Sequence, residues 1–153
     1  RVMECLNYSK AGSTEDIKNE IDRMVREEKL SLKQAECIKL KDIDTFAGSS
    51  IGERIKRAYA YGGVKREQPF VFEYDRQLVQ GVIDLYFIED GQLVIVDYKT
   101  DRVLRGRAGE DELRRRYSIQ LDYYAMALSQ ITGLKVKEKV IYSFALGRSL
   151  TVE

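Results

Sequence analysis

The chain has 153 residues, of which 44% are hydrophobic and 33% charged, so it is long enough and apolar enough to form one globular domain with a core. The charges of its 26 basic and 25 acidic residues nearly cancel, so the overall electrostatic field gives no indication of a nucleic-acid partner. The sequence has no histidine and only two cysteines, which excludes serine–histidine catalysis, disulfide frameworks and zinc sites that need imidazole. Any catalysis must therefore use carboxylates, lysine and a hard metal ion.

Neither a signal peptide nor an apolar run of the roughly 20 residues that span a bilayer is present, so we expect a cytoplasmic protein without a membrane partner. The sequence begins with Arg1 instead of methionine, and we expect it to be a fragment of a longer chain. Cys5 and Cys37 are interpreted as small buried hydrophobic residues.

Residues 1–63 predict helices. Ser13, with acidic residues directly after Thr14, is typical of a helix N-terminus, and the apolar residues that follow have helical spacing. Ser31 predicts the start of a second, short helix. A third follows the Gly48-Ser49-Ser50 break and ends at Gly62-Gly63.

Residues 64–153 predict strands and one long helix. The Asp-Gly pair between two apolar runs is among the strongest hairpin signals in a sequence. This order of elements predicts an α/β fold with a mixed central β-sheet flanked by helices, within a single domain 1–153. The expected strands are 69–74, 78–88, 93–99, 136–145 and 149–153, and the expected helix follows a polar stretch, 101–112, and ends near Gly133.

The hairpin register places two carboxylates side by side. If Asp90 and Gly91 are the loop of a type I′ turn, Asp84 faces Asp97, and directly opposed β-carbons are about 4.5–5.5 Å apart. Because side chains alternate along a strand, Lys99 lies on the same face as Asp97. The other face, with Leu85 and its neighbours, is expected to be the apolar core face.

This pair of acids indicates a metal site. Opposed like charges destabilise a strand pair, and a divalent cation such as Mg²⁺ or Mn²⁺ removes the repulsion because it prefers carboxylate oxygen. A lysine beside such a cation can stabilise charge that develops on a scissile phosphate. Asp97 and Lys99 alone could be a chance surface pair at a strand end; Asp84 in register favours the catalytic interpretation.

The segments Gly81–Asp84 and Asp97–Lys99 resemble the signature of the PD-(D/E)XK nuclease superfamily in its RecB-like form. The continuation to Asp101, the segment Tyr117–Tyr124 and the segment Arg66–Phe70 are similar to the nuclease domain of the AddA family of helicase–nucleases. The resemblance spans nearly the whole chain, and it implies a restriction-endonuclease-like core.

The resemblance also implies roles for residues of the hairpin. Asp84 and Asp97 would bind Mg²⁺ or Mn²⁺, with the backbone carbonyl of Tyr98 as a further ligand, and Lys99 would lie beside the attacking water. The family usually has a metal-binding histidine on an early helix, which this sequence lacks. Residues 1–6 resemble the stretch that follows that histidine, so we expect the sequence to begin just after it.

Further residues are implied to support the site. Gln120 and Tyr124 lie one helical turn apart and would face the site or the DNA, although Tyr124 could equally pack in the core. Glu67 is a supporting candidate whose simpler interpretation is a partner for a nearby arginine. Basic residues of 54–66 and 102–116 are expected to contact DNA phosphates. In the second segment these are Arg102, Arg105, Arg107, Arg114, Arg115 and Arg116.

The function implied is that of a DNA exonuclease domain in a bacterial, ATP-dependent helicase–nuclease of double-strand break repair and recombination. Its partners would be DNA, a helicase region in the same chain and an AddB-type protein. Two alternatives stay open: a catalytically inactive nuclease fold that serves DNA binding or the assembly of a larger complex, and a stand-alone RecB-like exonuclease.

Overall fold

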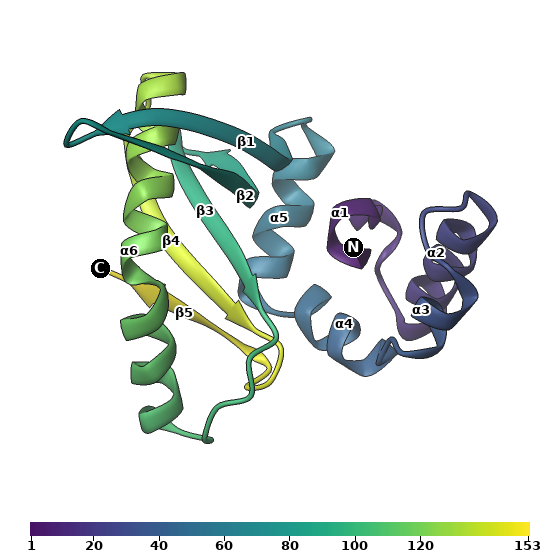
Figure 1. The fold of residues 1–153 in the computed structure, drawn as a ribbon. Helices are drawn as coiled ribbons and strands as arrows, with labels where there is room; N and C mark the ends of the chain where they lie inside the picture. Colours follow the sequence, from purple (N-terminus) through teal and green to yellow (C-terminus); the bar gives the residue numbers. More distant parts are fainter. The chain divides into compact units, whose positions relative to one another are not determined.

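The computed structural model describes residues 1–153, which form two compact units. The first unit, Arg1–Gly62, is helical, and the second, Gly63–Glu153, contains a β-sheet and one long helix (Figure 1). No helix combines the length and the apolar character that crossing a membrane requires.

Serine caps begin three helices of the first unit, α2, α3 and α5, and the caps at Ser13 and Ser31 were predicted from the sequence. The Ser13 hydroxyl accepts the N–H of Asp16 at 3.1 Å, and Ser31 forms a capping box with Gln34. The three predicted helices correspond to α2, α3 and α5, whereas α4 was not predicted because no side chain caps its start. The helices are α1 (Val2–Cys5), the 3₁₀ helix η1 (Tyr8–Lys10), α2 (Thr14–Arg26), α3 (Leu32–Glu36), α4 (Leu40–Ala47) and α5 (Ser50–Ala60).

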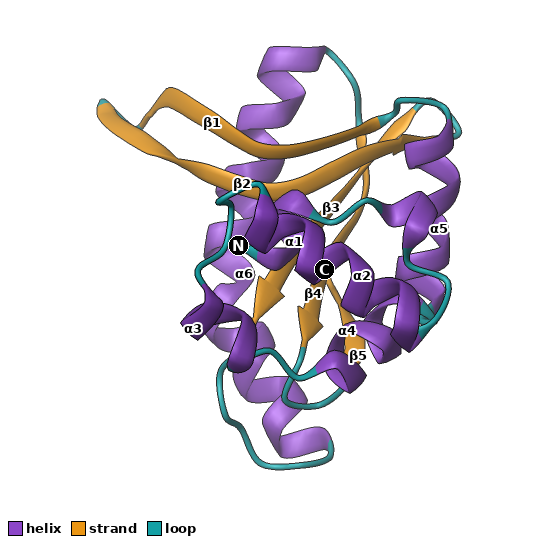
Figure 2. Cartoon of the chain, turned by 90° about the vertical axis from the view of Figure 1, so that its right-hand side faces the viewer, coloured by secondary structure: helices purple, strands orange, loops and turns teal.

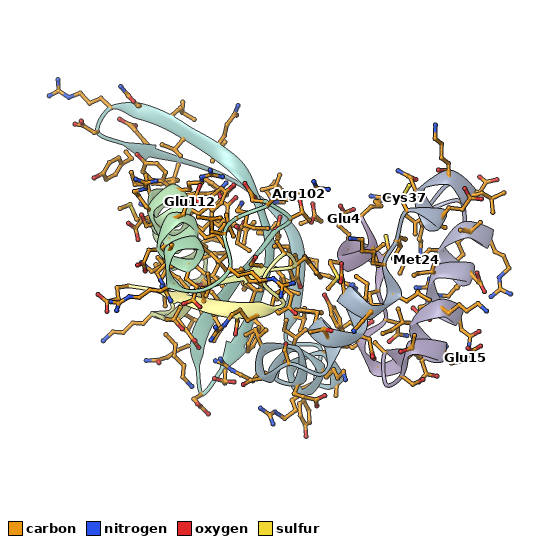
Figure 3. All side chains as sticks on the ribbon, turned by 90° about the horizontal axis from the view of Figure 1, so that it is seen from below. Glu4, Glu15, Met24, Cys37, Arg102 and Glu112 are labelled. Atoms are coloured by element: carbon orange, nitrogen blue, oxygen red, sulfur yellow. The ribbon has the colours of Figure 1, made fainter.

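Apolar and aromatic side chains fill the interior of the helical unit. Tyr8 and Phe46 pack edge to face with ring centroids 6.4 Å apart, and Met24, labelled in Figure 3, is fully buried. The prediction that both cysteines are buried is wrong: Cys37 is exposed where α3 ends, and Cys5 is half-buried.

The second unit contains a mixed five-stranded sheet, which confirms the predicted fold class. The strands lie in the order β1-β2-β3-β4-β5; β3 and β4 are parallel, and all other neighbours are antiparallel. Strand β1 begins five residues before the predicted Pro69. The elements are β1 (Val64–Tyr74), β2 (Gln77–Glu89), β3 (Gln92–Lys99), α6 (Arg107–Thr132), β4 (Val136–Ser143) and β5 (Arg148–Val152).

Two tight turns fix the register of β1, β2 and β3. Asp75 and Arg76 have φ of 48° and 61°, and Asp90 and Gly91 have φ of 53° and 73°, as type I′ turns require. The second turn gives the predicted register, which runs from Glu89 opposite Gln92 to Leu85 opposite Val96. Beyond the sheet, the β1–β2 hairpin continues as a two-stranded arm (Figure 2).

Helix α6 lies across one face of the sheet (Figure 1). Leu113, Leu121 and Leu128 are fully buried there and pack with Ile95 and Ile141 of the central strands. The helix expected after the polar stretch 101–112 begins earlier than predicted, because α6 already starts at Arg107. Its first turns are mostly exposed and charged, so they have no apolar stripe that would mark them as helix.

The start of α6 requires a glycine. A β-carbon at Gly109 would lie 1.8 Å from the backbone oxygen of Leu104, so Gly109→Ala must displace the segment that leads from β3 into α6. We expect the free energy of unfolding to fall by about 1–3 kcal/mol, as in other overpacked sites. Gly48→Ala is the matched control, because φ there is −86° and the nearest atom lies at an ordinary 3.5 Å. Equal urea midpoints for the two variants would contradict this expectation.

Candidate active site

Asp84 and Asp97 are the next pair in register after the β2–β3 ladder ends. The last backbone pair is Leu85 and Val96. One residue further along, the Asp84 carboxylate takes the place of a backbone carbonyl as hydrogen-bond acceptor: its Oδ2 accepts a hydrogen bond from the N–H of Tyr98 at 2.9 Å. This bond satisfies a strand donor with a side chain, and it anchors Asp84 beside Asp97 at the end of the hairpin.

The face that carries Asp97 is buried, in addition to the predicted core face with Leu85. Leu93 and Ile95 share this face with Asp97, because side chains alternate, and they belong to the core beneath α6. Asp97 itself is only 1% exposed. The opposite face, with Leu85 and Val96, is buried as well. The Asp97 carboxylate therefore lies buried at the edge of a hydrophobic core, near the end of β3.

Burial dominates the electrostatics of Asp97. Loss of water raises the pKa of its carboxyl group to about 6; Lys99 lowers that pKa, and the carboxylates of Asp84 and Asp101 raise it. Lys99 Nζ lies 2.7 Å from Asp97 Oδ2, but this buried oxygen accepts no hydrogen bond of good geometry, so the contact is an ion pair. Negative charge at Asp97 is thus only partly compensated by the protein.

Three groups surround the ammonium of Lys99. Besides Asp97, Gln120 Oε1 accepts a hydrogen bond from Nζ at 3.0 Å, and the ring centroid of Tyr117 lies 4.0 Å from Nζ. The Lys99 side chain is 15% exposed, so its head group is nearly enclosed but reachable. The structure thus brings the predicted Gln120 to the predicted Lys99 across the interface between β3 and α6.

Tyr124 packs in the core, and its role in the site stays a prediction. Its ring packs edge to face on Phe70, with centroids 5.5 Å apart, as a core residue would. Burial raises the pKa of its phenol, and the carboxylates of Asp97, Asp84 and Glu67 raise it further. The phenol therefore lies near these acids, of which Glu67 belongs to β1 and has a φ of 48°.

A pocket of about 360 Å³ opens beside Gln120 and Tyr124. It offers room for part of a substrate directly next to the groups that hold Lys99. Its lining consists of Phe70, Val79, Gln80, Gly81, Arg116, Ile119, Gln120, Tyr123 and Tyr124.

The residues present fit a divalent cation. Asp84 and Asp97 are adjacent carboxylates, and a buried Asp97 oxygen without a hydrogen bond is the kind of donor that a hard cation satisfies. No cluster of three or more histidine, cysteine or acidic side chains accompanies them, so further ligands would be backbone oxygen and water. The role of the Tyr98 carbonyl stays a prediction; its amide N–H is the group that the structure shows bonded to Asp84.

The predicted DNA-binding arginines fall into two groups. Arg102, Arg105 and Arg115 are exposed and have no ion-pair partner; Figure 3 labels Arg102 on the segment between β3 and α6. The others are paired with acids. Arg107 pairs with Asp111 at 3.8 Å, Arg114 with Asp111 and Glu110, and Arg116 with Asp101 and Glu112.

Two residues near Lys99 were not singled out for a role from the sequence, namely Tyr117 and Asp101. Tyr117 stands three residues before Gln120, hence on the same side of α6, and Asp101 follows Lys99 by two residues. That spacing was the available signal. Their mutual contact depends on how α6 packs against the end of β3, which no local pattern reveals.

Comparison with known proteins agrees with this geometry. The family model described as "PD-(D/E)XK nuclease superfamily" matches residues 5–150. Two similar proteins, each named as the A component of an ATP-dependent helicase/nuclease, come from Thermoanaerobacter sp. (strain X514), 40% identical over 97% of this chain, and Clostridium novyi (strain NT), 35% identical over 94%. The chain spans only 13% and 12% of their lengths.

Proposed function

Because this chain belongs to the PD-(D/E)XK nuclease superfamily, we propose that it is a metal-dependent deoxyribonuclease that hydrolyses phosphodiester bonds at Asp84, Asp97 and Lys99. The observation that supports this most is the Lys99 ammonium, held 2.7 Å from a buried carboxylate at the end of β3. A purely structural role explains poorly why a core face ends in two adjacent acids.

In this proposal, each residue has a chemical task. A bound Mg²⁺ would supply charge stabilisation and a more acidic water. Asp84 and Asp97 would hold that cation, and the low exposure of Asp97 would keep competing water away. The Lys99 ammonium would donate to a phosphate oxygen as negative charge develops on it, and Gln120 would keep the ammonium in place.

The wider context follows from the relatives' name. We propose that both units belong to one cytoplasmic nuclease domain that receives DNA from a helicase region in the same protein and works with an AddB-type partner. Such a domain would act as an exonuclease in double-strand break repair and recombination.

The proposal is tested by hydrolysis of end-labelled linear DNA in Mg²⁺, in Mn²⁺ and in EDTA, with a calorimetric titration of Mn²⁺ alongside. We expect shortening from the ends in either metal and none in EDTA. A protein that binds Mn²⁺ and DNA but never cleaves would instead favour the inactive, DNA-binding alternative.

The unpaired arginines should contribute most to DNA binding. Arg102 and Arg105 lack acidic partners, so replacing both with alanine should weaken DNA binding and reduce the slope of log K against log salt by about 1–2. Arg114→Ala is the control, because Glu110 and Asp111 already neutralise that guanidinium. Fluorescence anisotropy of labelled DNA at several salt concentrations measures the affinity and the slope. An equal loss of DNA affinity in Arg114→Ala would contradict the expectation.

A further inference from the structure

The contact between Lys99 and Tyr117 differs in kind from the other two contacts of the ammonium. Asp97 and Gln120 each present an oxygen to Nζ, whereas Tyr117 presents the face of its ring at 4.0 Å. An ammonium has three N–H donors. A ring attracts the charge without using any of them, so Tyr117 can hold Lys99 while a donor stays available for a phosphate oxygen.

Tyr117 is itself fixed at its far end. Its hydroxyl donates to Asp101 Oδ1 at 2.7 Å, and Arg116 Nη1 approaches the same oxygen at 3.3 Å. Asp101 follows β3 and Tyr117 belongs to α6, so this bond ties the two elements together directly beside Lys99. Donation to a carboxylate also pushes electron density into the phenol ring, which strengthens its attraction for a cation.

We propose that Tyr117 and Asp101 form a positioning pair: Asp101 orients Tyr117 and polarises its ring, and the ring holds the Lys99 ammonium where it acts on the scissile phosphate. The inference rests on the proposed nuclease function. Neither residue needs to touch DNA or metal for this role. Their effect is exerted on kcat through Lys99.

Three variants distinguish the effect of the Tyr117 ring on kcat from the effect of its hydroxyl. Tyr117→Leu removes the ring and should lower kcat by about 3- to 30-fold at nearly unchanged KM for DNA. Tyr117→Phe keeps the ring and should recover most of that loss. Asp101→Asn should resemble Tyr117→Phe, and combining the two should cost no more than either alone, because both act through one bond.

The controls make the same chemical changes elsewhere in the same unit. Tyr74→Leu removes a ring that packs edge to face against Tyr123, with centroids 5.7 Å apart, and Asp122→Asn removes an acid that pairs with Lys139 at 2.6 Å. Neither residue approaches Lys99, so both variants should keep the wild-type kcat.

A direct readout does not depend on cleavage. With ¹³C at the lysine Cε, the Lys99 methylene protons should be shifted upfield in NMR spectra by the Tyr117 ring; Lys99→Arg assigns the signal by removing it. The shift should vanish in Tyr117→Leu and persist in Tyr117→Phe. Wild-type kcat in Tyr117→Leu, or no upfield shift in the wild type, would overturn the inference. A wild type that shows the shift but never cleaves DNA would overturn the proposed function and leave the contact itself established.

Discussion

Replacing Asp97 with asparagine should abolish DNA hydrolysis while the protein stays folded. The change removes one of two adjacent carboxylates and keeps the shape of a side chain that is only 1% exposed. We expect kcat to fall by roughly 10³-fold or more, and the calorimetric Mn²⁺ signal to disappear. Glu89→Gln is a suitable control, since this acid pairs with Lys137 at the other end of the hairpin. Retained cleavage would mean that the chemistry takes place elsewhere.

The same variant should be more stable than the wild type at neutral pH without metal. The pKa of Asp97 is raised from 3.8 to about 6, so the folded state disfavours the charged carboxylate. The wild type therefore loses unfolding free energy, on the order of 3 kcal/mol, as the pH rises from about 4 to about 6. The neutral amide of the variant has no such loss. Thermal unfolding in EDTA should show a higher Tm for Asp97→Asn at pH 7.5 and nearly equal Tm values at pH 4; a lower Tm at pH 7.5 would contradict this.

The register of the hairpin could be predicted from the sequence because local chemistry determines it. Asp90-Gly91 favours the positive φ values of a type I′ turn, and a two-residue loop determines which residues of the two strands lie opposite each other. Once the register is known, the positions of Asp84 and Asp97 follow. The resemblance to a nuclease family rested on these same positions, and the family match confirms it.

The parts that could not be predicted depend on packing between distant segments. Nothing near Asp84 in the sequence indicates that its carboxylate bonds to the Tyr98 amide after the ladder ends. The burial of Asp97 depends on α6 covering that face, and a period-two pattern could not reveal it because Leu93 and Ile95 lie within an unbroken apolar run. The pairing of Tyr117 with Asp101 likewise depends on where α6 crosses β3.

Lys99→Met should separate catalysis from metal binding. Methionine keeps most of the length of the side chain but removes the ammonium, so we expect kcat to fall by roughly 10²- to 10³-fold. Mn²⁺ should bind at least as tightly as to the wild type, because a positive charge 2.7 Å from Asp97 Oδ2 is gone. The control is Lys137→Met, which removes an ammonium that pairs with Glu89 and Asp90 far along the hairpin. Weaker Mn²⁺ binding would show that Lys99 organises the acids instead of acting on the substrate.

The stability of the two variants should change in opposite directions, and this provides the stricter test of the site's electrostatics. Without Lys99, the buried Asp97 loses the partner that lowers its pKa, so Lys99→Met should lose roughly 1–3 kcal/mol of unfolding free energy at pH 7.5. At pH 4 the carboxyl group is mostly protonated, and the loss should be much smaller. Adding Asp97→Asn removes the charge that Lys99 compensates, so the double variant should recover the stability at pH 7.5. If Lys99→Met cost the same unfolding free energy in the Asp97→Asn background as in the wild type, the 2.7 Å ion pair would contribute nothing to folding, and the sheet would hold Asp97 in its charged form by other means.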